Sequence, residues 1–176
     1  MSDGRCGLCR HGQPLARGLG GNVCNDTVVA AEARRRRFTY PREAIVMKHE
    51  IIEIPVISDA IRKLGAPTSA LTRVGGLLYT CGMPPIDLKT GAIVKGDMTA
   101  QTRACMDALA FTLQHAGSSF DNVFKSLVFI TDNDFAAEMN AVYRDYFPSG
   151  FPARSCVAIK PWAHFDIEIE CIATVG

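Results

Sequence analysis

The chain has 176 residues, 48% of them hydrophobic and 21% charged, which is the composition of a soluble globular protein long enough to form a proper core. The formal net charge of +1 hides an asymmetry, because residues 1–46 carry a net charge of +4 and residues 47–176 carry −3. A mildly acidic domain is a poor candidate for gripping a phosphate backbone, so we expect no nucleic-acid partner.

The first 46 residues are rich in glycine and arginine and sustain no apolar period of a strand or a helix. No apolar stretch of a signal peptide follows the start, so we expect a cytoplasmic protein with no membrane partner. A transit peptide is an alternative because of the run Arg34–Arg37, although the four acidic residues are atypical of one. We interpret residues 1–46 as a disordered tail, or as a start assigned too early, before a domain that spans residues 47–176.

The seven cysteines fall into two groups. Four residues of the tail are of the types that bind zinc, but their spacing fits no common zinc module, so we predict no metal site. They are Cys6, Cys9, His11 and Cys24. The cysteines of the domain each lie in an apolar run, as reduced and buried cysteines do, which favours a reducing compartment. They are Cys81, Cys105, Cys156 and Cys171.

The first predicted elements of the domain are strands. Residues 51–56 form a short apolar run that ends near a proline. Residues 71–74 and 77–81 are β-type runs on either side of Gly75–Gly76. Because a tight turn needs the positive φ that glycine readily adopts, these two runs predict a β-hairpin.

Two helices with a strand between them are predicted next. Asp97 is the expected N-cap of a helix that runs to about His115, and Gly117 is its stop. A strand is predicted at residues 125–131. The second helix follows the capping cluster Asp132–Asp134 and carries an amphipathic stripe of helical spacing. The stripe consists of Phe135, Met139, Val142 and Tyr146.

The last two predicted strands, residues 151–159 and 165–174, each hold charges that strand interiors usually exclude. Arg154 lies at the start of the first of them. In the second, alternation places the apolar residues on one face and Glu168 and Glu170 on the other. The order β-β-β-α-β-α-β-β predicts an α+β fold, a six-stranded mixed sheet with two helices packed on one face.

Several short motifs of the domain follow one another in an order and at a spacing typical of one family. They include Arg73–Gly82, Asp87–Gly91, Ala100–Arg103, Met139–Tyr143, Pro152–Val157 and Ile167–Ala173. From about residue 50 to Val175 the chain therefore resembles the RidA/YjgF family of enamine/imine deaminases. This resemblance implies a chorismate-mutase-like fold and a homotrimer with a ligand cleft at each subunit interface.

The resemblance also implies roles for particular residues. Arg154 matches the arginine that binds the substrate carboxylate, a task that suits a guanidinium because it can grip a carboxylate in a bidentate fork. Glu168 matches the acid that positions the attacking water. Gly82, Asn140 and Cys156 match pocket positions. From the residues alone, a salt bridge between Arg154 and an acid of the last strand remains the alternative.

Two departures from the family pattern affect the pocket. Thr68 stands where archetypal members have a tyrosine, and Met83 replaces the glutamine that usually follows Gly82. We expect Thr68 to line the substrate pocket, and both changes to remove an aromatic wall and alter the entrance of the cleft. The two changes indicate a substrate different from 2-aminoacrylate, and an aminomuconate-type or other bulkier enamine acid is one candidate.

The implied function is the hydrolytic deamination of enamine/imine intermediates of amino acids to 2-oxo acids and ammonia. It requires no metal and no organic cofactor. Two alternatives stay open. One is a small-ligand-binding or regulatory trimer without turnover. The other is RNA cleavage, which the acidic domain and the lack of an aromatic-basic strip disfavour.

Overall fold

The computed structural model describes residues 48–161 and 164–176, so the tail and its zinc-type residues lie outside the described residues. The elements in chain order are β1 (Glu50–Ile52), α1 (Ile57–Lys63), β2 (Leu71–Val74), β3 (Leu77–Thr80), α2 (Met98–His115), η1 (Phe120–Asn122), β4 (Val123–Ile130), η2 (Asn133–Phe135), α3 (Ala136–Asp145), β5 (Ala153–Ala158) and β6 (Ile167–Thr174).

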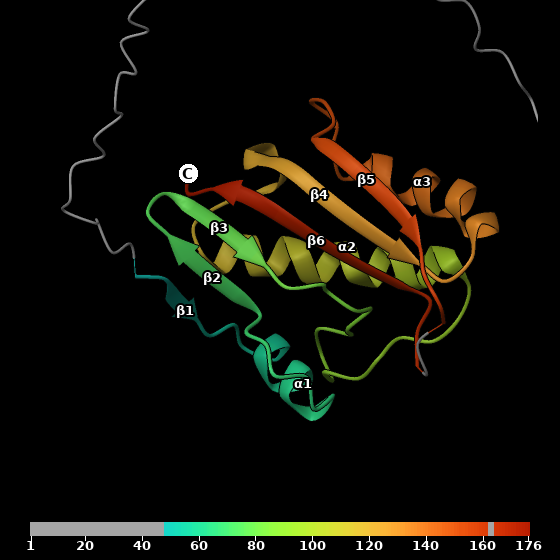
Figure 1. Cartoon of the computed structure of the whole chain (residues 1–176), viewed down its shortest axis with the longest axis horizontal. Helices are drawn as coiled ribbons and strands as arrows, with labels where there is room; N and C mark the ends of the chain where they lie inside the picture. Colours follow the sequence, from blue (N-terminus) through green and yellow to red (C-terminus); the bar gives the residue numbers. More distant parts are fainter. Residues whose placement is uncertain (1–47, 162–163) are drawn as a thin grey trace, which may run out of the picture. The chain divides into compact units, whose positions relative to one another are not determined.

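These strands form one six-stranded sheet in the order β1-β2-β3-β6-β4-β5. All neighbouring pairs are antiparallel except β4 and β5, which are parallel and are joined through α3. A parallel pair needs such a crossover, because its second strand must start at the same end as the first. Figure 1 shows α2 and α3 on the same side of the sheet. The predicted mixed sheet with two helices on one face is confirmed.

The ends of the predicted elements have the expected causes. The Asp97 carboxylate accepts a hydrogen bond from the backbone N–H of Ala100 at 2.8 Å and so caps α2. Gly117 follows α2 with a φ of 74°, and Gly75 turns the β2–β3 hairpin with a φ of 58°. Asp132 accepts from the backbone N–H of Asp134 at 2.9 Å, which starts the turn into α3.

Helix α1 is an addition to the predicted elements, and β1 is shorter than the expected strand at residues 51–56. Ile57, Ala60 and Ile61 recur at helical spacing and are buried in the core. This pattern spans only seven residues, too few to distinguish a helical period from chance. The two-helix count from the sequence therefore missed one short helix.

Strand β6 shows how the sheet separates its two faces. Ile167, Ile169 and Cys171 are buried, whereas Glu168 and Glu170 between them are half-buried. The buried set packs with α2 and α3 in one hydrophobic core, and we call this side of the sheet the helix face. The predicted alternation is confirmed, and the glutamates project from the opposite face.

Candidate functional site

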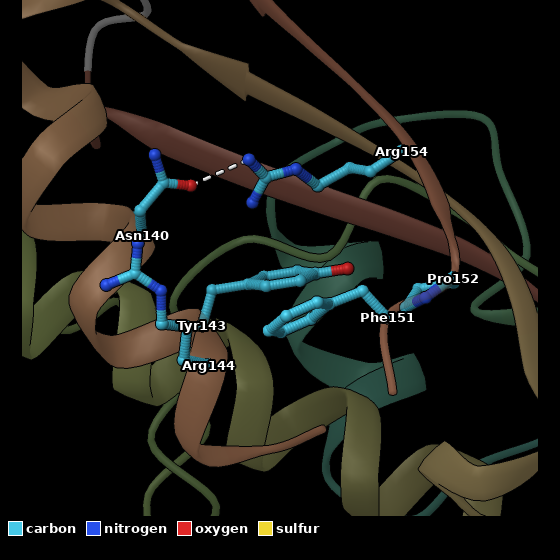
Figure 2. Close-up of a pocket in the computed structure, with 6 residues that line it drawn as sticks. All are labelled: Asn140, Tyr143, Arg144, Phe151, Pro152 and Arg154. Atoms are coloured by element: carbon cyan, nitrogen blue, oxygen red, sulfur yellow. Dashed lines mark hydrogen bonds between the residues drawn. The ribbon is translucent and has the colours of Figure 1, made fainter. Parts of the chain in front are cut away.

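Arg154 is held by side chains of α3 (Figure 2). Its Nη2 donates a hydrogen bond to Oδ1 of Asn140 at 2.7 Å, and its guanidinium carbon lies 4.6 Å from the centroid of the Tyr143 ring. The Tyr143 hydroxyl shares a hydrogen bond of 2.7 Å with Oγ of the buried Ser126. Because the Tyr143 ring supports the guanidinium and Asn140 orients it, the Arg154 side chain has little rotamer freedom to lose when a ligand binds.

A cavity of about 390 Å³ opens in front of this guanidinium and has no acidic side chain in its lining. Its lining residues are Asn140, Tyr143, Arg144, Phe151, Pro152 and Arg154. Among the described residues, no carboxylate lies within 4.0 Å of Arg154. The alternative of a salt bridge to an acid of the last strand is therefore wrong for this chain. The cavity presents an oriented cation with capacity to bind an anion.

Glu168 lies against Gly82. A Cβ atom built on Gly82 would stand 2.7 Å from Oε2 of Glu168, so a larger residue here would displace this carboxyl group from its position. Burial, and then the neighbouring Glu170, raise the pKa of Glu168 to about 7. A carboxyl group with that pKa is present in both protonation states near neutral pH, which suits a proton acceptor and donor.

Thr68 lines a second cavity, of about 620 Å³, together with Cys81 at the end of β3. Burial, and then the charge of Glu168, raise the pKa of the Cys81 thiol to about 12. The Cys81 thiol is thus close enough to Glu168 for the two groups to interact electrostatically. Thr68 itself is exposed and makes one long hydrogen bond, 3.5 Å, to the backbone oxygen of Ser69.

Met83 does not shape the entrance of a cleft, which corrects the expectation from the sequence. Its side chain is fully buried in the core, and its backbone forms an isolated bridge with Ile169. The backbone N–H groups of the two residues donate to each other's carbonyl oxygens at 2.9 and 3.2 Å. An apolar side chain fits here because the position packs inside the protein.

Cys156 lies two residues beyond Arg154 on β5 and is exposed. Partial burial raises the pKa of its thiol, and the nearby Arg154 charge only partly opposes this. A thiol of raised pKa is a poor nucleophile at neutral pH. We therefore assign Cys156 no role as a nucleophile. It lies on β5 near Arg154, but it does not line the 390 Å³ cavity.

The strand register places Arg154 and Glu168 on opposite faces of the sheet. Ser126 of β4 pairs with Arg154 of β5 and with Cys171 of β6, so Arg154 belongs to the helix face. Phe129 pairs with Glu168, which projects from the other face. One copy of the chain thus holds two separate groups of candidate residues, one on each face of the sheet. Asn140 is grouped with Arg154, and Gly82 is grouped with Glu168.

Sequence reasoning assigned no role to three residues of the Arg154 side. Tyr143 could have been predicted as a site residue, because it follows Asn140 by about one helical turn and so lies on the same face of α3. Phe151 is an aromatic residue with 64% of its surface exposed, immediately before the Pro-Ala-Arg motif. Arg144 carried no signal, because a charged residue at the end of a helix is ordinarily a surface residue.

Across residues 48–161 and 164–176, no three or more His, Cys, Asp or Glu side chains gather in a way that could hold a metal ion. Within the same ranges, every helix is too short or too polar to cross a membrane.

Comparisons with known proteins agree with this fold. A family model described as Endoribonuclease L-PSP matches residues 59–175. A RutC family protein of Pyrococcus horikoshii is 41% identical over 123 residues, which cover 69% of this chain and 96% of that protein. The mitochondrial protein mmf1 of Schizosaccharomyces pombe is 36% identical over 123 residues, which cover 68% of this chain and 74% of that protein. The crystal structure of the Rid family protein YyfA from Yersinia pestis has 34% identity and a TM-score of 0.66, covering 73% of this chain and 100% of that one. The chain therefore belongs to the RidA/YjgF family, whose model carries the L-PSP endoribonuclease description.

Proposed function

We propose that this protein hydrolyses enamine/imine intermediates of amino acids to 2-oxo acids and ammonia. The observation that carries the proposal is the Arg154 guanidinium, which Asn140 orients and Tyr143 supports in a cavity without acidic side chains. Every 2-imino acid has a carboxylate next to its C=N carbon, and Arg154 would hold that carboxylate. Holding it also fixes the position of the reacting carbon.

The reaction then needs a water molecule and one group that moves protons. An enamine first tautomerises to the imine. Glu168 takes a proton from water as the oxygen bonds to the C=N carbon and gives this proton to the imine nitrogen, which leaves a carbinolamine. Glu168 then takes the proton of the new hydroxyl group and passes it to the amine nitrogen, so the C–N bond breaks, the C=O bond forms and ammonia leaves. Imine and water are thereby converted to 2-oxo acid and ammonia, and a pKa of about 7 allows both proton transfers at neutral pH.

This mechanism requires two copies of the chain, because Arg154 and Glu168 of one copy face opposite sides of its sheet. We infer a homotrimer in which the Arg154 half-site of one copy meets the Glu168 half-site of the next. Strand β5 forms an edge of the sheet with five of its six residues exposed. Exposed Phe124, Phe151 and Val157 lie on or beside this edge, as expected of a surface that a second copy covers.

A ligand-binding trimer without turnover is the second candidate. One observation favours it: Thr68 is exposed beside the 620 Å³ cavity, where a family tyrosine would provide a wall. The Arg154 cavity would serve binding equally well, so ammonia release distinguishes the two candidates. RNA cleavage, which the family description names, is disfavoured by the net charge of −3 on residues 47–176.

The test generates imines from a panel of amino acids with an amino-acid oxidase, in the presence of semicarbazide. An active deaminase competes with semicarbazide, so the wild-type protein is expected to lower semicarbazone formation and to release ammonia. Arg154→Ala is expected to lose about 10- to 100-fold in kcat/KM, which corresponds to losing a charge-assisted hydrogen bond. Failure of the wild type with every imine rejects deamination. An Arg154→Ala variant as active as the wild type rejects the proposed anchor.

A cytoplasmic location remains a prediction. The name of the Schizosaccharomyces pombe relative places that protein in mitochondria. For this chain the question concerns the arginine-rich residues 1–46, interpreted as a disordered tail or a start assigned too early, with a transit peptide as the alternative. Imaging of a fluorescent protein fused behind residues 1–46 decides between diffuse cytoplasmic signal, which we expect, and import into an organelle.

A further inference from the structure

Arg144 lines the same cavity as Arg154 and stands out among the arginines of the described residues. Three of these five form ion pairs with acids, namely Arg62, Arg73 and Arg103. The two without an acidic partner within 4.0 Å are Arg144 and Arg154, and both line the 390 Å³ cavity. The cavity thus gathers two guanidinium groups that no described carboxylate neutralises.

Arg144 and Arg154 are both neighbours of Asn140. Arg144 follows Asn140 by four residues on α3, so the two side chains are neighbours on one face of the helix. Asn140 in turn accepts the hydrogen bond from Arg154. Figure 2 shows the rings of Tyr143 and Phe151 below the Arg154 guanidinium. The cavity therefore combines two cations with an aromatic wall against which a short aliphatic chain can pack.

We propose that Arg144 binds a second carboxylate, on the side chain of the substrate, and that the protein prefers enamine/imine acids derived from acidic amino acids. The assignment of Arg154 to the carboxylate next to the reacting carbon rests on the proposed function. Arg154 then holds one end of a dicarboxylate and Arg144 the other. Arg154 is half-buried, where a cation favours an anion more strongly than on open surface, and Arg144 is exposed.

An ordinary structural role gives a different expectation. Arg144 lies in the last turn of α3, where a positive charge stabilises the helix C-terminus. If this were its whole role, Arg144→Met would lower thermal stability and leave the relative affinity for two ligands unchanged. The comparison of two matched ligands therefore separates recognition from stability.

The decisive experiment measures binding by calorimetry with the full-length protein. The ligands are 2-oxopentanedioate and 2-oxopentanoate, which have the same carbon chain and differ only in the terminal carboxylate. The wild type is expected to bind the dicarboxylate about tenfold or more tightly, as one charge-assisted hydrogen bond provides. Arg144→Met is expected to abolish this preference and to lower the affinity for 2-oxopentanedioate much more than that for 2-oxopentanoate. Arg144→Lys should restore part of the preference.

Arg73→Met is the matched control, because it removes the same charge from β2, away from the cavity. It should keep the wild-type preference. Equal affinity of the wild type for both ligands, or a preference that survives in Arg144→Met, overturns the proposal. Loss of the preference in Arg73→Met overturns it too, because the effect would then reflect net charge. Displacement of 2-oxopentanedioate by inorganic phosphate at equal concentration would show an unselective anion site and overturn the dicarboxylate assignment.

Turnover of the corresponding imines distinguishes this proposal from the proposed function. Hydrolysis of both imines at equal kcat/KM overturns the substrate preference and leaves deamination intact. Binding that prefers the dicarboxylate, without hydrolysis of either imine, supports the role of Arg144 and rejects deamination. A higher kcat/KM for the dicarboxylic imine that falls in Arg144→Met supports both.

Discussion

Arg154 donates a hydrogen bond from Nη2 to Oδ1 of Asn140 at 2.7 Å. This bond sets the direction of the guanidinium without neutralising its charge, because the amide acceptor is uncharged. The Tyr143 ring below supports the group by a contact that also preserves the charge. The chain thus presents an oriented cation to a cavity of about 390 Å³.

The neutrality of Asn140 gives the first prediction. Asn140→Asp is nearly isosteric and keeps an acceptor for Arg154, but it places a carboxylate beside the guanidinium. We expect this variant to lose about 100-fold in substrate affinity, more than Asn140→Ala, because the new carboxylate competes with that of the substrate. KM values of the three proteins for one imine check the order. Activity of Asn140→Asp at the wild-type level would show that the charge of Arg154 does not bind the substrate.

Gly82 gives the second prediction. In Gly82→Ala the new methyl group would lie 2.7 Å from Oε2 of Glu168, so the carboxyl group must move. We expect kcat to fall by about 10- to 100-fold while KM changes little, because a displaced proton-transfer group affects chemistry more than binding.

Gly76→Ala is the control for this substitution. Gly76 has no atom within 4 Å of the position of its Cβ, so we expect wild-type kinetics. Equal losses in the two variants would point to a general disturbance of the fold.

The pKa of Glu168 gives the third prediction. If ionised Glu168 accepts the proton from water, kcat/KM rises with pH around a midpoint of about 7. Glu170→Gln removes the like charge and should move this midpoint to lower pH, while burial keeps it above that of an exposed glutamate. The Cys81 thiol also faces Glu168 and stays protonated over this range. A pH–rate profile that is identical in Glu170→Gln contradicts the assignment.

Stability provides an independent check on the same group. The folded protein binds the Glu168 proton more tightly than the unfolded chain, whose pKa is near the ordinary value of 4.5. The stability that this proton contributes is fully present below about pH 4.5 and is lost as pH rises through about 7. Glu168→Gln lacks the titration, so its free energy of unfolding should decline less than that of the wild type across this window. Chemical denaturation at several pH values measures the difference.

Tyr143 gives the fourth prediction. Tyr143→Phe leaves the aromatic face under Arg154 but removes the hydrogen bond to the buried Ser126. We expect a loss of about 1–3 kcal/mol in the free energy of unfolding, because the serine hydroxyl remains buried without a partner. The double variant Tyr143→Phe with Ser126→Ala should recover part of this loss. A double variant that is destabilised by the sum of both single changes would show that the two hydroxyl groups act independently.

Much of the fold could be predicted because local sequence patterns determine where its helices and strands begin and end. Asp97 and Gly117 bound α2, and Gly75 turns the hairpin, as their side chains or their freedom in φ require. The alternation of β6 correctly put Glu168 opposite the buried residues. Helix α1 was missed because its buried residues span only two turns and its start at Val56 has no side-chain cap.

The candidate site was only partly accessible from the sequence. Motifs selected Arg154 and Glu168, but the faces they occupy depend on which strands pair, and pairing is a tertiary property. Met83 was misread as an entrance residue because its bridge to Ile169 joins distant parts of the chain. Arg144 could not be predicted as a site residue, because the absence of an acidic partner and the position in a cavity are known only from the structure.

The shared site between copies is tested most directly by mixing two strongly impaired variants, Arg154→Ala and Glu168→Gln. The two chains are co-expressed with different affinity tags, and trimers that carry both tags are isolated and assayed for imine hydrolysis. In a cyclic trimer whose sites each take Arg154 from one copy and Glu168 from the next, every mixed trimer has one intact site, about one third of the wild-type number. We predict that each variant alone keeps at most about a tenth of wild-type activity and that mixed trimers regain about one third of it. Mixed trimers that form but stay as inactive as the single variants would contradict the account.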